Sequence, residues 1–243
     1  MTLILIHGAW AGAWVWDALA TELEACGHRV ICLDLPGDGT HPIPPEATTT
    51  ADLHDALSTA IDSVDGPVVL VGHSGGGMLV TAGAERFPER VSHGIWIAGM
   101  LIPDGRSFDD IQTAIVGPGE TFGVTAQVQS SDCGRYSVVP RQAAIDYFLQ
   151  DASPEQQQYA ADRFTAQPAA GRRLLTPTTA AFEKLPKLYV LTTEDRSVIP
   201  AAQRAMAGST SQVCVAEIET GHVPQLICPD VLAGLIDRWL AAS

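Results

Sequence analysis

Short apolar runs alternate with amphipathic stretches along most of this chain, and this alternation limits the fold more than any other feature of the sequence. The runs are rich in Val, Ile and Leu, as expected for parallel strands that are buried on both faces. The sequence therefore predicts the α/β class, with a mostly parallel six-stranded sheet flanked by helices. The predicted strands are Leu3–Ile6, Val30–Leu33, Val68–Val71, Gly94–Ala98, Lys187–Leu191 and Gln212–Glu217.

The clearest helical pattern lies between the second and third predicted strands. Within residues Ala51–Val64, the apolar residues Leu53, Leu57, Ile61 and Val64 recur at intervals that bring them to one face of a helix. The aspartates of this segment fall elsewhere around the helix, so we expect them to face solvent.

The alternation stops after the fourth predicted strand and resumes with the fifth. The intervening residues 103–184 are rich in Gln, Thr, Pro and Ala, and they include helix-like pieces at Arg141–Gln150 and Pro154–Phe164. A loop of this length without structure of its own would be unusual. We therefore predict a single domain over residues 1–243, in which residues 103–184 form a cap inserted between the fourth and fifth core strands.

The composition excludes several kinds of partner. The chain carries 28 acidic and 14 basic side chains, which gives a formal net charge of −14, and 46% of its residues are hydrophobic. That hydrophobic content is too high for a disordered chain, and the charge offers no basic surface to nucleic acid or to an anionic membrane. No apolar run approaches the ~18 residues that a membrane-spanning helix needs.

The cysteines and histidines indicate neither a disulfide framework nor a metal site. The five cysteines are odd in number, form no C-x-x-C pair and have no zinc-ligand spacing to a histidine. We expect them to be structural, mostly buried thiols of a cytoplasmic protein.

The motif that carries chemistry is Gly72-His73-Ser74-Gly75-Gly76, which follows the third predicted strand and precedes the helical pattern Met78–Arg86. In a strand–turn–helix context, the two outer glycines of G-x-S-x-G allow a sharp turn that presents the serine hydroxyl at the carboxyl end of the sheet. Ser74 is thus the predicted nucleophile, and a plain glycine-rich turn is the alternative. A phosphate-binding loop is excluded because its G-x-x-x-x-G-K-[ST] pattern is absent.

A serine nucleophile needs a base, and the base needs an orienting acid. In this architecture the acid and then the histidine follow the serine along the chain. Of the histidines, only His93 and His222 come after Ser74. His222 follows the last predicted strand, at the carboxyl edge of the sheet, whereas His93 precedes a strand. We therefore predict His222 as the base.

For the orienting acid we predict Asp195, which comes just after the strand Lys187–Leu191. Its neighbour Glu194 is a competitor, and Asp104, after the preceding strand, is the second-choice position. The alternative is that Asp195 is a solvated loop residue without a catalytic role.

The oxyanion hole of such a site consists of two backbone N–H groups, one from the residue after the nucleophile and one from the loop after the first strand. These are Gly75 and Ala9 in this sequence. Trp10 beside Ala9 is either pocket lining or core, whereas Trp14 and Trp16 are predicted to be core.

Taken together, these motifs resemble the α/β-hydrolase fold, and more narrowly the family of plant methylesterases that includes the salicylic-acid-binding esterase and the hydroxynitrile lyases, with their bacterial esterase relatives. The resemblance implies a catalytic triad of Ser74, Asp195 and His222, oxyanion donors at Ala9 and Gly75, no cofactor and no metal. Relatives are often homodimers. The motifs, in family order, are His7-Gly8-Ala9-Trp10, Ala13-Trp14-Val15-Trp16, Gly27-His28-Arg29-Val30, Asp34-Leu35-Pro36-Gly37, Gly72-His73-Ser74-Gly75-Gly76, Ser153-Pro154-Glu155, Tyr189-Val190-Leu191-Thr192 and Gly221-His222.

Two differences from the hydroxynitrile lyases favour the esterase branch of this family. The lyases have a Thr at the position of Gly8 and a Lys at the position of Val223, and cyanide release needs a cation near the leaving group. The family often has a His where this chain has Ala11, which affects the mouth of the pocket.

The predicted function is a serine carboxylesterase that acts on small neutral apolar or aromatic esters through an acyl-enzyme intermediate. The acidic net charge disfavours anionic substrates. Alternatives are an amidase, a carbamate hydrolase or a hydroxynitrile lyase on the same triad, and a non-catalytic small-ligand receptor. The cap aromatics Phe122, Tyr147, Phe148 and Phe164 suggest an apolar pocket, and the predicted substrate-binding residues are Gly8, Trp10, Phe122, Phe148 and Val223.

Overall fold

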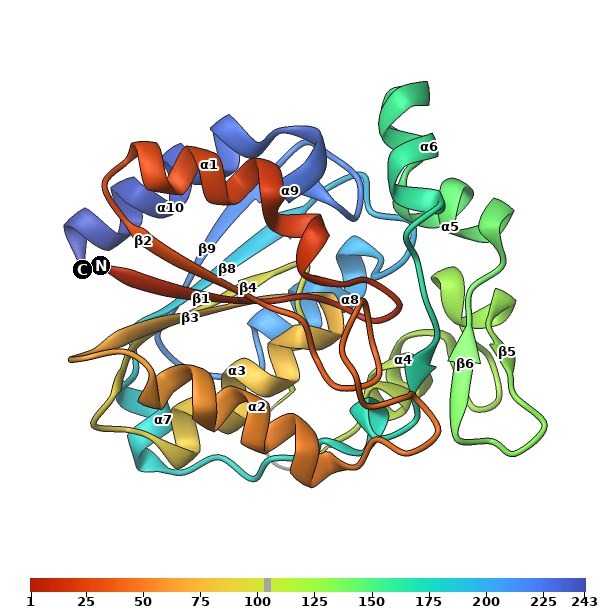
Figure 1. Ribbon diagram of the computed structural model, residues 1–243, viewed down its shortest axis with the longest axis horizontal. Helices are drawn as coiled ribbons and strands as arrows, with labels where there is room; N and C mark the ends of the chain where they lie inside the picture. Colours follow the sequence, from red (N-terminus) through yellow and green to blue (C-terminus); the bar gives the residue numbers. More distant parts are fainter. Residues whose placement is uncertain (103–105) are drawn as a thin grey trace.

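In the computed structural model, which describes residues 1–102 and 106–243, six parallel strands form one sheet in the order β2-β1-β3-β4-β8-β9 (Figure 1). The sheet confirms the predicted fold class. β4 begins three residues earlier than predicted, at Val91. The apolar pattern does not reveal this start because Ser92 and His93 are polar. The strands are β1 (Thr2–Ile6), β2 (Arg29–Leu33), β3 (Val68–His73), β4 (Val91–Ile97), β8 (Lys187–Thr192) and β9 (Val213–Ile218).

Helices cover both faces of the sheet, as Figure 1 shows. The side chains of β1 alternate between the two layers: Leu3 and Leu5 pack with α1 and α10, while Ile4 and Ile6 pack with α2, α3 and α8. The inner strands β1, β3, β4 and β8 are therefore buried on both faces, as the apolar runs predict, whereas the edge strands β2 and β9 are only partly buried. The helices are α1 (Asp17–Ala25) and α10 (Pro229–Ala242) on one face, and α2 (Thr50–Asp62), α3 (Gly77–Arg86), α7 (Ala180–Lys184) and α8 (Pro200–Ala207) on the other.

The predicted helix between β2 and β3 is α2, and it buries Leu53, Leu57 and Ile61 as expected. One of its aspartates has a structural role that the pattern does not reveal. The side chain of Thr49 accepts a hydrogen bond from the backbone N–H of Asp52, and the Asp52 carboxylate accepts one from the backbone N–H of Thr49, at 2.8 Å. This capping box satisfies two donors at the helix start.

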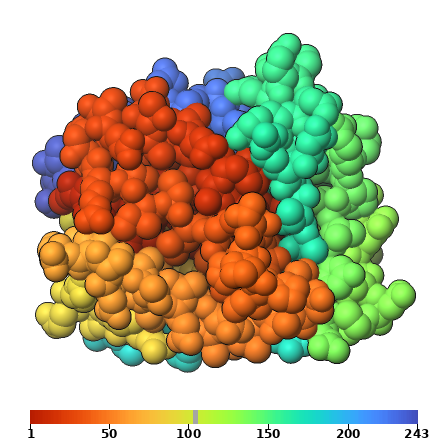
Figure 2. All heavy atoms as spheres, in the orientation of Figure 1, coloured from red at the N-terminus to blue at the C-terminus, as the bar shows by residue number. Residues whose placement is uncertain are grey.

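Most of the segment between β4 and β8 lies at the carboxyl ends of the parallel strands (Figure 1) and makes up one end of the molecule in the space-filling view (Figure 2, mainly green). Its last residues run back along the face of α2 and α3 to α7. Its small antiparallel sheet, of order β5-β6-β7, has strands too short to leave a periodic pattern. The two predicted helices are present but end earlier. That residues 103–184 act as a cap stays a prediction. The elements are α4 (Phe108–Val116), β5 (Gln129–Ser130), β6 (Tyr136–Val138), α5 (Arg141–Phe148), α6 (Pro154–Ala161) and β7 (Gln167–Pro168).

The cysteine environments correct one expectation. All five are free thiols, but Cys26, Cys133 and Cys214 are exposed, while Cys32 and Cys228 are half-buried, so the prediction of mostly buried thiols is wrong. These residues lie at strand and loop surfaces where a small side chain is tolerated in either environment. Among the described residues, no helix is both long and apolar enough to cross a membrane.

The turn from β3 into α3 leaves no room for side chains at two glycines. A Cβ at Gly72 would lie 2.7 Å from the backbone of Gly76, and a Cβ at Gly76 would lie 2.6 Å from the carbonyl oxygen of His7. A Cβ at Gly75, by contrast, would meet its nearest neighbour, the backbone nitrogen of Ala9, at an ordinary 3.7 Å. The outer glycines of the motif therefore allow α3 to start directly against the end of β1.

This contrast gives a matched pair of variants. We expect Gly76→Ala to destabilise the fold by about 2 kcal/mol or more, because overpacking against backbone atoms cannot be relieved by a rotamer change. Gly75→Ala should stay within about 1 kcal/mol of the wild type. Thermal and urea unfolding measure both values, and equal stability of the two variants would contradict this account of the turn.

Candidate active site

A cavity of about 1260 Å³, its open mouth included, lies at the carboxyl edge of the sheet. Loops after β1, β3, β4, β8 and β9 line it from the sheet, and the inserted segment lines it from above. It brings together most of the site residues that the sequence predicts. Those that line it are Gly8, Ala9, Trp10, Ser74, Gly75, Phe148, His222 and Val223.

Ser74 is the first residue after β3, and its backbone adopts a φ of 50°, in the left-handed region that residues with a side chain rarely occupy. Such a conformation costs about 1–3 kcal/mol and persists only where the surroundings enforce it. Here the carbonyl oxygen of Ser74 accepts a hydrogen bond from the backbone N–H of Met100 at 2.8 Å, next to the tight glycine turn. Ser74 is 8% exposed and faces the cavity.

His222 and Asp195 form a buried pair. The Nδ1 atom of His222 lies 2.7 Å from Oδ2 of Asp195, and the two residues are only 2% and 3% exposed. Because a carboxylate accepts hydrogen bonds, the pair holds the proton on Nδ1 and leaves Nε2 as a free lone pair. This is the tautomer that a general base requires.

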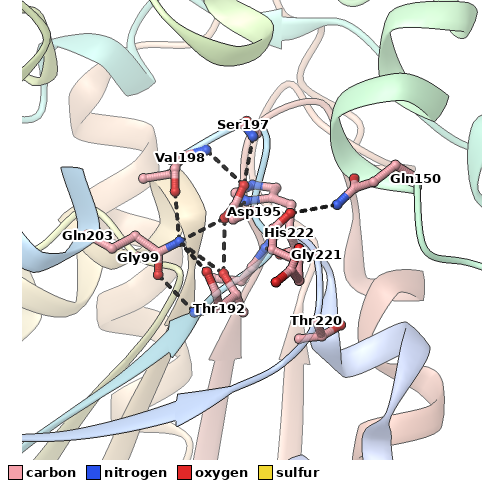
Figure 3. Close-up of polar contacts among 12 residues, drawn as sticks. Gly99, Gln150, Thr192, Asp195, Ser197, Val198, Gln203, Thr220, Gly221 and His222 are labelled. Carbon is pink, nitrogen blue, oxygen red and sulfur yellow. Dashed lines mark hydrogen bonds and ion pairs between the residues drawn. The ribbon is translucent and has the colours of Figure 1, made fainter. Parts of the chain in front are cut away.

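The Asp195 carboxylate is surrounded by donors (Figure 3). Its Oδ1 atom accepts from the backbone N–H groups of Ser197, at 2.7 Å, and Val198, at 3.0 Å. Its Oδ2 atom accepts from the hydroxyl of Thr192 at 3.1 Å and from Nε2 of Gln203 at 3.0 Å, in addition to His222. A buried carboxylate is stable only when it is paired and hydrogen-bonded in this way.

The backbone around His222 is held from two sides. Nε2 of His73 lies 2.8 Å from the carbonyl oxygen of His222 and donates to it, and burial lowers the pKa of His73 well below its ordinary value, so that this ring stays neutral. From the inserted segment, the carboxylate of Asp151 accepts from the hydroxyl of Thr220 at 2.9 Å and from the N–H of Gly221. The loop that carries His222 is thus fixed to both β3 and the insertion.

The two candidate oxyanion donors, Ala9 and Gly75, lie on adjacent loops, as the 3.7 Å approach at Gly75 indicates. The peptide between Gly8 and Ala9 is oriented by His7, whose Nδ1 donates to the carbonyl oxygen of Gly8 at 2.8 Å. The other ring nitrogen of His7 accepts from the N–H of Leu35 at 3.1 Å, and burial lowers the pKa of His7. The neutral ring therefore fixes the loop without competing for a proton.

Trp10, the next residue, is held by the insertion through three hydrogen bonds. Its backbone N–H donates to the side chain of Gln167 at 2.9 Å, its carbonyl accepts from Thr165 at 2.8 Å, and its indole donates to Ser137 at 3.3 Å. Its φ of 61° is also in the left-handed region. The inserted segment thus maintains a strained loop next to Ala9.

Aromatic rings form a stack over the base. Phe148 lies parallel to the ring of His222, with centroids 5.2 Å apart and planes at 26°, and Trp10 stacks on Phe148 at 6.0 Å and 29°. Phe164 packs against Phe148 at 5.5 Å. Trp16 is fully buried, as predicted for a core residue, and Trp14 packs edge-on against Phe164.

One predicted substrate-binding residue lies away from the cavity. Phe122 packs in the core behind Phe108, with ring centroids 5.7 Å apart, and its backbone N–H donates to Gln112. Phe108 lines the cavity in its place. Tyr147, on α5 of the insertion, is partly buried against the neighbouring core and does not line the cavity.

The rival base lies away from the Asp195–His222 pair. His93 lies on β4 and shares a hydrogen bond with the hydroxyl of Ser243, at the opposite end of the sheet. Glu194 is exposed, whereas Asp195 is buried. Asp104 lies outside the described residues. In the part of the chain that the structure describes, no three His, Cys, Asp or Glu side chains gather as metal ligands.

The sequence reasoning missed the residues that hold the site. Asp151 after α5 and Gln167 on β7 make their contacts across long stretches of sequence, and no motif marks them. Gln203 on α8 is only eight residues from Asp195, but no motif marks it either. His73 and His7 could have been found, because each directly precedes a residue of the predicted site and a buried histidine there has few other roles.

Comparison with known proteins decides the family. The model of the alpha/beta hydrolase family matches residues 3–235. The chain belongs to this family. Among curated relatives, this hydrolase is 30% identical over 254 residues to Methylesterase 17 of Arabidopsis thaliana, with 96% of this chain and 89% of that protein covered. It is 28% identical over 264 residues to Methylesterase 2 of the same plant, with 99% and 95% covered.

Among solved structures, a pyrethroid hydrolase from Sphingobium faniae JZ-2 matches the hydrolase with a TM-score of 0.85 at 23% identity, over 100% of this chain and 98% of that one. At this identity the likeness shows the fold. Together, the comparisons confirm the resemblance to the plant methylesterases and the fold that the sequence predicts.

The Asp195–His222 pair gives a direct test of the site. We expect Asp195→Asn to lower kcat by on the order of 10³–10⁴-fold, because an amide can no longer fix the proton on Nδ1 of His222. KM should change little. Glu194→Gln, at the exposed neighbour, serves as the matched control and should keep activity within about twofold. Steady-state ester hydrolysis measures both, and similar losses in the two variants would contradict the assignment of the acid.

Proposed function

We propose that this hydrolase is a serine carboxylesterase with Ser74 as nucleophile, His222 as base and Asp195 as orienting acid. The observation that carries the proposal is the buried Asp195–His222 hydrogen bond, which leaves Nε2 of His222 free at the cavity that Ser74 faces. The ester-hydrolase class agrees with the methylesterase relatives.

In the proposed reaction, the Ser74 hydroxyl attacks the ester carbonyl carbon while Nε2 of His222 takes its proton. The N–H groups of Ala9 and Gly75 stabilise the negative oxygen of the tetrahedral intermediate. His222 then donates the proton to the leaving alkoxide, and an acyl group remains on Ser74. A water molecule repeats the two steps and releases the acid.

We propose that the substrates are small neutral esters with apolar or aromatic groups. Among the described residues that line the cavity, the permanently charged side chains are Arg172 and Asp109, both exposed, and their charges are opposite. The remainder is mostly apolar, and an unpaired anion would lose its hydration there without a buried partner. Gly8, Trp10, Phe148 and Val223 are the proposed substrate contacts that the cavity lining supports.

The site supports hydrolysis better than cyanide release. Gly8 has no room for a side chain in this backbone, since a Cβ would lie 2.8 Å from Cβ of Ser74, and Val223 supplies no cation beside His222. An amidase or a carbamate hydrolase would use the same three groups. A non-catalytic receptor would leave the oriented proton of His222 without a role.

We also propose that the hydrolase is cytoplasmic, forms a homodimer and has no nucleic-acid partner. The acidic net charge supports the last statement, because nucleic acid would meet no basic surface.

The proposal predicts that wild type hydrolyses short-chain nitrophenyl esters and that Ser74→Ala lowers kcat by on the order of 10⁴-fold or more. Both proteins are compared by release of nitrophenol after correction for the spontaneous rate. Cyanide release from mandelonitrile by wild type should stay at background. Full hydrolytic activity in Ser74→Ala, or cyanide release that depends on His222, would overturn the proposal.

A further inference from the structure

The apolar lining of the cavity divides between the two packed layers that cover the two faces of the sheet. The lining residues of the layer with α2 and α3 are aliphatic or sulfur-containing except for Phe108, and we name five of them the aliphatic wall: Leu35, Leu53, Met78, Leu79 and Leu174. Those of the layer with α1 and α10 include three aromatic residues, the aromatic wall: Trp10, Phe148 and Phe164.

The nucleophile lies between the two walls. Ser74 follows β3, an inner strand of the sheet, and the two walls belong to the layers that pack on opposite faces of this sheet, so they flank Ser74 from both faces. An ester bound with its carbonyl at Ser74 therefore directs one of its two groups toward each wall. The question is which group, acid or alcohol, meets which wall.

The position of the base answers this question. His222 has to give its proton to the oxygen of the departing alcohol, so this oxygen must come within hydrogen-bond reach of the imidazole. The ring of Phe148 lies parallel to that imidazole at 5.2 Å, and Trp10 and Phe164 pack on Phe148. The first atoms of the alcohol group consequently lie beside the aromatic wall.

We infer that the hydrolase prefers esters of an arylmethyl alcohol with an aliphatic acid, an inference that rests on the proposed esterase function. Aromatic rings gain from offset or edge-on packing against other rings, which favours an aryl group in the alcohol. Flexible Leu and Met side chains adapt to straight or branched alkyl groups, which favours an aliphatic acid on the opposite wall.

The test uses two isomeric esters, benzyl butanoate and propyl phenylacetate. They have the same composition, neither carbonyl is conjugated to the ring, and they differ in the side of the ester that carries the phenyl group. We expect wild type to show a kcat/KM for benzyl butanoate about tenfold higher than for propyl phenylacetate, given the usual size of aromatic packing preferences. Equal values, or the reverse order, would overturn the inference.

A variant of the aromatic wall tests whether this wall causes the preference for an aryl alcohol. Phe148→Leu should reduce the ratio of the two kcat/KM values at least about threefold, because the ring that would contact the aryl group is gone. If the loss of the ring also displaces His222, kcat/KM falls by the same factor for both esters, and the ratio does not change. Phe87→Leu is the matched control, since Phe87 is half-buried at the end of α3 and does not line the cavity, and its ratio should equal that of wild type.

The outcomes separate the two proposals. If wild type hydrolyses neither isomer nor a short nitrophenyl ester, the esterase function itself fails and this inference falls with it. If both isomers are hydrolysed and the ratio is at or below one, the inference alone fails. The wild-type ratio decides this even if Phe148→Leu does not fold. A ratio that Phe148→Leu and Phe87→Leu leave equally unchanged would also overturn the assignment to the aromatic wall.

Discussion

The hydrogen bond between His222 and Asp195 is the interaction on which the rest of the site depends, because it determines which nitrogen of the imidazole is free at the cavity. It joins the ends of two neighbouring strands, β8 and β9, and it lies in the interior, where an unpaired carboxylate would be unstable. The carboxylate is therefore surrounded by donors from Thr192, Ser197, Val198 and Gln203. The packing of α8 against β8, which brings Gln203 to this place, is thus part of the site.

The inserted segment contributes to the site in two ways. It lines the cavity through Phe148 and Phe164. It also holds two loops of the sheet, because Asp151 accepts hydrogen bonds from the loop that carries His222 and Gln167 accepts one from Trp10. A segment that only covered the cavity could vary freely without affecting the catalytic groups. Here, changes in the insertion that alter substrate contacts are expected to alter the positions of the base and of the oxyanion loop as well.

The fold and the centre of the site could be predicted because each rests on local sequence. The apolar runs mark strands buried on both faces, and the outer glycines of the Ser74 motif, Gly72 and Gly76, mark a turn that has no room for side chains at these two positions. The supporting contacts could not be predicted, since Gln203 and Asp151 meet their partners only after the chain has folded. Phe122 and Phe108 show the same limit: both are aromatic residues of the insertion, and only tertiary packing decides that Phe108 faces the cavity. The strands β5 and β7 are too short to leave a periodic pattern.

The central claim is that an acyl group is transferred to Ser74 before water reaches it, and product partitioning measures this most directly. Three butanoate esters with different alcohols are hydrolysed in the presence of the same concentration of methanol, and methyl butanoate and butanoic acid are quantified. A shared acyl-enzyme predicts the same ratio of the two products from all three esters, because the alcohol has left before the partition. A ratio that changes with the leaving alcohol would contradict the account.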